Sequence, residues 1–114
     1  MSRPEPTPAV AEEIDQAARQ AATALRTLGE LARSDYRINP ALHALEVLAA
    51  DDGPLAELCA VFTDLASYLG DFEHEDAETA ADAVEDAAGQ LYGGPDAVNT
   101  LLHRAANTLR PLAD

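Results

Sequence analysis

The chain has 114 residues, with seven basic residues against 21 acidic ones, which gives a formal net charge of −14 at pH 7. A hydrophobic fraction of 47% supports a folded core and argues against a wholly disordered chain. No apolar run approaches the roughly 18 residues of a membrane span, and no signal peptide opens the sequence. The single cysteine, Cys59, excludes an intramolecular disulfide and a thiolate metal cage. We therefore expect a soluble protein of the cytoplasm, with no membrane partner.

The composition favours helices throughout the chain. It holds 25 Ala and 15 Leu but only 5 Val and 2 Ile, so good helix formers far outnumber the β-branched residues that strands prefer. We predict an all-α fold, an antiparallel bundle of about five helices that resembles a four-helix bundle and carries one long N-terminal helix. Residues 1–8, in which prolines alternate, are predicted to form a flexible tail, and residues 9–114 a single helical domain.

The first predicted helix covers residues 8–34. Its apolar residues are spaced alternately by four and three, which is typical of a long amphipathic helix. These residues are Val10, Ile14, Ala17, Ala21, Ala24, Leu28 and Leu31. Because this helix is longer than the others, part of its apolar seam extends past a five-helix core. We therefore predict a homodimer whose interface includes Val10, Ile14, Ala17 and Ala21.

Four shorter helices follow, separated by proline and glycine. Asn39 is predicted to cap the second helix ahead of Pro40, and residues 51–53 to end it. The third begins at Pro54, ends near Gly70 as a C-terminal cap, and has the most apolar seam, so we expect it at the centre of the core. That seam consists of Leu55, Leu58, Phe62, Leu65 and Leu69.

The fourth and fifth helices differ in the size of their inward side chains. The fourth spans about 76–91 and turns a face of small residues inward, which allows close packing but supplies little apolar area. Residues 93–96 then break the chain before the fifth helix. The inward residues expected on these two helices are Ala77, Ala80, Ala81, Val84, Ala88 and Leu91, followed by Val98, Leu102, Ala105, Leu109 and Leu112.

The negative charge belongs to the middle of the chain. No arginine lies between Arg37 and Arg104, and that stretch carries fourteen acidic residues. On the fourth helix they form a stripe that we predict to dock a basic protein partner, and that disfavours nucleic acid and anionic membranes. The stripe consists of Glu75, Glu78, Asp82, Glu85 and Asp86. Alternatively, arginines of the first helix could neutralise it, within one chain or across a two-fold axis; these are Arg19, Arg26 and Arg33.

Motifs for metal or catalytic chemistry match poorly. Residues 71–82 place oxygen ligands at several calcium-loop positions, but Asp76 stands where the loop needs glycine and Asp82 where it needs glutamate. Arg37 and His43 have a spacing found in some helical ribonucleases, although a proline intervenes and the net charge would repel RNA. We expect no metal site, no cofactor and no catalytic residue.

The sequence therefore predicts a non-catalytic, acidic protein-interaction or regulatory protein, with a bacterial origin suggested by its Arg- and Ala-rich composition. A sharper alternative is an antitoxin, immunity protein or nucleic-acid mimic that covers a basic active site. A second alternative is a small helical enzyme or ligand-binding bundle that uses Arg37 and His43. A secreted helical hairpin fits the length, but the prolines divide this chain into too many helices.

Overall fold

A computed structural model describes residues 7–34 and 37–113, and the part described is all-α. Its helices are α1 (Pro8–Ala32), α2 (Ile38–Ala49), α3 (Pro54–Gly70), α4 (Glu75–Leu91) and α5 (Val98–Leu109), followed by the 3-10 turn η1 (Arg110–Leu112). The predicted fold class is confirmed, and each helix lies where the seam and the proline or glycine breaks indicated. The predicted tail falls largely on residues 1–6, outside the described residues; Thr7 caps α1 and Pro8 begins it.

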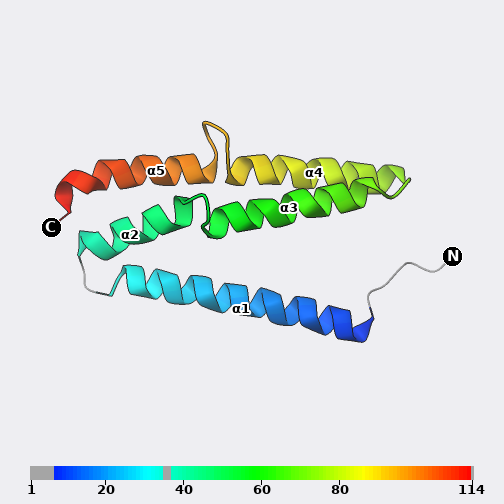
Figure 1. The fold of residues 1–114 in the computed structure, drawn as a ribbon, viewed down its shortest axis with the longest axis horizontal. Helices are drawn as coiled ribbons and strands as arrows, with labels where there is room; N and C mark the ends of the chain where they lie inside the picture. The colour runs from blue at the N-terminus through cyan, green and yellow to red at the C-terminus, as the bar shows by residue number, and fades with distance from the viewer. Residues whose placement is uncertain (1–6, 35–36, 114) are drawn as a thin grey trace.

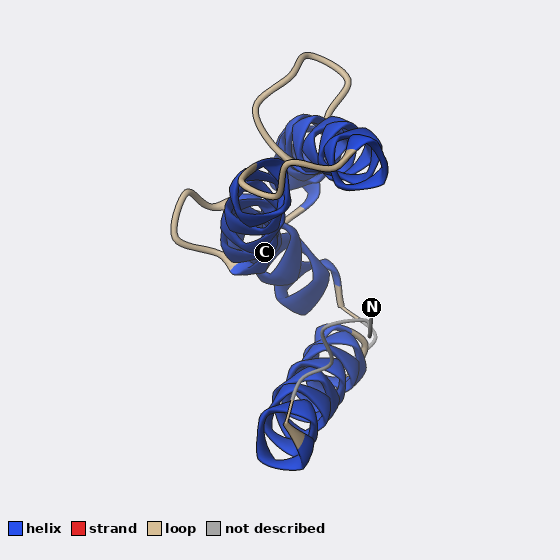
Figure 2. Cartoon of the chain, turned by 90° about the vertical axis from the view of Figure 1, so that its right-hand side faces the viewer, coloured by secondary structure: helices blue, strands red, loops and turns tan. Residues whose placement is uncertain are grey.

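The helices lie in three antiparallel rows (Figure 1): α1, then α2 followed by α3, then α4 followed by α5. α3 packs mainly on α4, and α2 mainly on α5, while α1 contacts chiefly α2. The end-on view shows the rows stacked in one direction, with the N-terminal helix apart from the others (Figure 2). The chain measures 62 × 32 × 17 Å, and 17 Å is less than two helix diameters of 10–12 Å each.

This thin arrangement leaves a small core. The radius of gyration is 17.8 Å, whereas a compact domain of this length has about 13 Å. Among the described residues, the buried apolar side chains are one leucine and six alanines, and α1 contains no buried residue. These residues are Leu42, Ala49, Ala66, Ala81, Ala88, Ala97 and Ala106. Alanine lets the α3 and α4 axes approach closely, but it removes little apolar surface from water.

The prediction that the third helix forms the centre of the core is wrong. Leu58 and Leu65 are 41% and 46% exposed, and of the α3 residues only Ala66 is fully buried. The physical reason is that α3 packs mainly on α4, and no helix among the described residues buries Leu58 and Leu65. On α4, Ala81 and Ala88 point inward as predicted, whereas Ala80 is exposed.

Two predicted caps also differ from the structure. α2 begins at Ile38 with Arg37 at the N-cap, so Asn39 lies within the first turn instead of capping it. Pro40 is tolerated there because a first-turn residue has no partner inside the helix for its N–H, which proline lacks. At the other position, Gly70 is the last residue of α3, and Asp71 follows it in a right-handed helical conformation.

The second and third rows are both interrupted at the same level (Figure 1). Gly53 is the N-cap of α3 in one row, and the 92–97 connection links α4 to α5 in the other. The Tyr92 hydroxyl donates a hydrogen bond to the Asp51 carboxylate between the rows, and this bond, with a small contribution from burial, raises the pKa of Tyr92. Gly93 has a φ of 102°, in the left-handed region that favours glycine, and its N–H donates to the buried Asn99 side chain at 3.1 Å.

Candidate functional site

The candidate site is the acidic face of α4, which we define by Glu75, Glu78, Asp82, Glu85 and Asp86. All five side chains are exposed. α4 packs on α3 through Ala81 and Ala88, and the acidic residues lie to one side of that contact line. The helical spacing of three and four residues places them on one continuous surface. The stripe predicted from the sequence is therefore present as an exposed surface.

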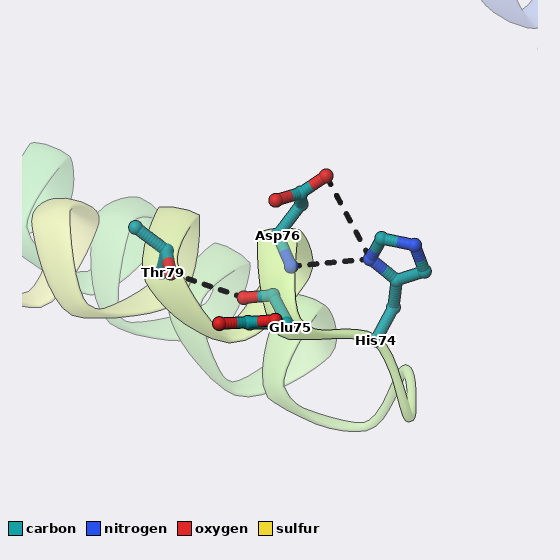
Figure 3. A network of polar contacts seen from close by, with 4 residues as sticks. All are labelled: His74, Glu75, Asp76 and Thr79. Carbon is teal, nitrogen blue, oxygen red and sulfur yellow. Dashed lines mark hydrogen bonds and ion pairs between the residues drawn. The ribbon is translucent and has the colours of Figure 1, made fainter.

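The first turn of α4 is shaped by its own polar groups (Figure 3). His74 is the N-cap, and its Nδ1 accepts a hydrogen bond from the backbone N–H of Asp76 at 3.1 Å. An Nδ1 that accepts carries no proton, so its 4.0 Å separation from the Asp76 carboxylate is not an ion pair in this arrangement. Glu75, Asp76 and Glu78 lie near the positive end of the helix dipole, which stabilises carboxylates there.

A shallow groove of about 340 Å³ runs between α3 and α4 beside this face. Glu78, Asp82 and Glu85 line its α4 side, and the hydroxyls of Thr63 and Ser67 line its α3 side. Thr63 donates its hydroxyl proton to the Cys59 carbonyl at 2.9 Å, which keeps that hydroxyl oriented along its own helix. The groove therefore presents three carboxylates on one wall and small polar groups on the other.

The acidic face is not neutralised by the arginines of its own chain. Within residues 7–34 and 37–113, one arginine forms an ion pair with an acidic residue: Arg110 Nη2 lies 3.3 Å from Glu46 Oε1. Glu46 belongs to α2, not to the acidic face. The arginine stripe of α1, consisting of Arg19, Arg26 and Arg33, forms no ion pair with the acidic face in that range. Arg33 instead donates from Nε to the carbonyl of Gly29 at 3.1 Å. Neutralisation within one chain is therefore not seen in the described part.

The alternative sites predicted from the sequence are dispersed. Arg37 is exposed at the start of α2, six residues before His43. His43 lines a groove of about 520 Å³, whose other lining residues are mainly apolar side chains of α1 and α2. No hydrogen bond or ion pair joins the two residues in the described part of the chain. No group of three or more metal-binding side chains occurs among the residues that the structure describes, so the 71–82 segment does not gather its carboxylates.

Cys59 lies in the α3–α4 contact. Its thiol is half-buried and donates a weak hydrogen bond to the Ala88 carbonyl, with Sγ 3.5 Å from the oxygen. This contact gives the cysteine a packing role between the two helices.

The predicted dimer-interface residues Val10, Ile14, Ala17 and Ala21 are all exposed on α1. The sequence seam had suggested an unpaired helix, but it did not reveal that α3 also leaves an apolar side uncovered. That side consists chiefly of Leu58, Val61 and Leu65. The signal was the i, i+3, i+7 spacing of these residues: Leu58 and Leu65 were predicted to lie in the core, and Val61 was not singled out.

Each helix in the described ranges is too short or too polar to cross a bilayer. Comparison of the chain with protein-family models, with curated proteins and with solved structures found no match to any of them.

Proposed function

We propose that this protein is a non-catalytic interaction module that docks a basic protein partner through the acidic face of α4. The observation that supports the proposal is the exposure of five carboxylates on one helix, with no arginine of the described chain paired to them. A surface of one sign accelerates encounter with an oppositely charged partner and disfavours partners of like charge. In this proposal the protein acts in the cytoplasm, is not an enzyme and binds no nucleic acid.

The experiment compares two variants with the same change in charge. In the first, Glu78→Gln, Asp82→Asn and Glu85→Gln remove three charges from the groove beside α3. In the second, Glu12→Gln, Glu13→Gln and Asp15→Asn remove three exposed charges from α1. Each tagged protein is used to capture partners from an extract of its own cells, and the captured proteins are identified by mass spectrometry and then purified for titration.

We expect a basic partner that binds the natural protein and the α1 variant alike, and that loses at least tenfold in affinity for the α4 variant. Its binding should weaken steeply between low and moderate salt, because exposed charge pairs are screened at a Debye length of about 10 Å in 0.1 M salt. A partner that binds the α4 variant with unchanged affinity, or that is indifferent to salt, would contradict the proposal.

The sharper form of the proposal is an antitoxin, immunity protein or nucleic-acid mimic. In that case the captured partner is a basic enzyme whose active site the acidic face covers, and its activity falls in proportion to the complex formed. The Arg37/His43 enzyme alternative gains no support, because Arg37 is the extended N-cap of α2 and no hydrogen bond or ion pair among the described residues joins it to His43.

The homodimer predicted from the sequence also remains a proposal. It concerns a different surface, on α1, which includes Val10, Ile14, Ala17 and Ala21.

A further inference from the structure

One side of α3 lies between two apolar grooves. The larger, of about 410 Å³, separates α3 from α1, with Leu25 on the α1 wall and Leu58 and Val61 on the α3 wall. The smaller, of about 220 Å³, lies between α3 and α4, with Leu65 on one wall and Val84 on the other. We call these five residues the apolar face; its four α1 and α3 members are 41–50% exposed.

The apolar face and the acidic face lie on opposite sides of the helix layer. Ala81 and Ala88 of α4 are buried against α3 and mark the contact line between the two helices. Val84 borders the apolar groove on one side of this line, whereas Glu78 and Asp82 border the polar groove on the other. The helix layer is therefore amphipathic, with a mainly apolar side and a strongly anionic side.

The chain exposes much more surface than a compact protein of its mass. The accessible surface is 8610 Å², whereas a compact protein of 12.0 kDa exposes about 6,000 Å². The excess is larger than the roughly 800 Å² per partner that a standard interface buries, and falls in the range of obligate homodimers. The single chain therefore leaves enough surface in water for an interface with a macromolecular partner, and the apolar face is part of that surface.

We propose that a second copy of the chain covers the apolar face, forming a two-fold dimer whose acidic faces point outward. Charge restricts where this occupant can bind. Each copy carries a net charge of −14, so two copies repel each other overall and can make a stable contact only through a surface with few acidic residues. The walls of the two apolar grooves contain one charged residue, Glu57. Contact through this side keeps the two α4 helices apart, whereas contact through the acidic face would bring like charges together.

The α1 seam supports a symmetric partner. Read in either direction, it begins with large side chains, passes through alanines and ends with large side chains: Val10, Ile14, Ala17, Ala21, Ala24, Leu28 and Leu31. In a two-fold contact, if residue i of one copy touches residue j of the other, then residue j of the first copy also touches residue i of the second. The α1 helices of the two copies, packed antiparallel, would therefore have alanines at the centre of the contact and large side chains at both ends. By helical spacing Ile14 and Ala21 share a side of α1 with Leu25, so the seam is continuous with the apolar face.

The oligomeric state of the full chain tests the proposal. We expect light scattering at micromolar concentration to give twice the 12.0 kDa of one chain, in low salt and in high salt alike. The variant Val61→Asp places a carboxylate in the apolar face, and we expect its dimer to dissociate at least a hundredfold more readily. Because Val61 is 50% exposed in the single chain, the substitution leaves the helices formed, which circular dichroism checks.

Leu112→Asp is the control, since Leu112 is 61% exposed in η1, outside the apolar face. We expect it to dimerise like the natural chain. A 12.0 kDa species for the natural chain throughout the micromolar range would overturn the proposal, as would a dimer that Val61→Asp leaves intact. The result is independent of the acidic face: loss of the dimer and loss of the basic partner are caused by different substitutions, and only the second is sensitive to salt.

Discussion

Arg110 Nη2 lies 3.3 Å from Glu46 Oε1, and this ion pair joins the C-terminal end of the third row to α2 across 64 residues of sequence. The two side chains are 55% and 42% exposed, so water screens the pair. We expect Arg110→Ala to lower the free energy of unfolding by no more than about 1 kcal/mol, and less in high salt. Urea denaturation checks this, with Arg104→Ala, which removes an exposed arginine without a partner in the described chain, as the control.

Because of the hydrogen bond between Tyr92 and Asp51, we expect the stability of the fold to decrease at alkaline pH. This bond raises the pKa of Tyr92 in the folded chain above the ordinary value of 10.0. A group with a raised folded pKa stabilises the fold fully below its unfolded pKa, and this contribution is lost as pH rises through the folded pKa. We expect the melting temperature to fall above pH 10, and Tyr92→Phe to be less stable at pH 8 but to show a smaller decrease. Equal decreases in both proteins would count against this account.

Replacement of glycine by alanine should lower the stability of the fold at Gly53 and raise it at Gly89. A Cβ at Gly53 would collide with the Val47 carbonyl oxygen and lie 3.1 Å from that of Ala50, both of them backbone atoms that cannot move aside cheaply. We expect Gly53→Ala to cost at least about 2 kcal/mol of stability. At Gly89, within α4, nothing lies within 4 Å of the added atom, and the helix gains about 0.5–1 kcal/mol from losing a glycine. Urea denaturation of both variants shows whether the two changes in the free energy of unfolding have opposite signs.

Leu42 and Leu65 distinguish the buried core from the uncovered side of α3. Leu42 is 8% exposed, so Leu42→Ala should cost about 2–5 kcal/mol. Leu65 is 46% exposed, so Leu65→Ala should cost less than about 2 kcal/mol in the single chain. Both are best measured in the Val61→Asp background, where no second copy contributes. Equal losses would show that Leu65 belongs to the core of one chain after all.

The helices could be predicted from the sequence because their signals are local. Pro54 and the 93–96 break fix the limits of α3 and α4 through backbone geometry alone, and the alternating spacing on α1 fixes its amphipathic character. The acidic stripe was found in the same way, since helical spacing suffices to gather Glu78, Asp82 and Glu85.

The arrangement of the helices could not be predicted in the same way. An apolar seam such as the one with Leu58 and Leu65 indicates which side of a helix is buried in a packed structure. It does not show whether another helix of the same chain or a second molecule buries that side. Sequence reasoning placed these leucines in the core because a closed bundle is the usual solution for amphipathic helices. Contacts between α3 and α4 through Ala66, Ala81 and Ala88 depend on close axis approach, which no local pattern specifies.

The coincident breaks in the second and third rows divide the molecule at one joint. On one side is the α3–α4 hairpin that carries the carboxylates, and on the other the α2–α5 pair. The chain crosses this joint at the connections around Gly53 and Tyr92, because no helix is continuous from α2 into α3 or from α4 into α5. The hydrogen bond from Tyr92 to Asp51 spans the joint, so it helps to fix the direction in which the anionic hairpin projects from the α2–α5 pair.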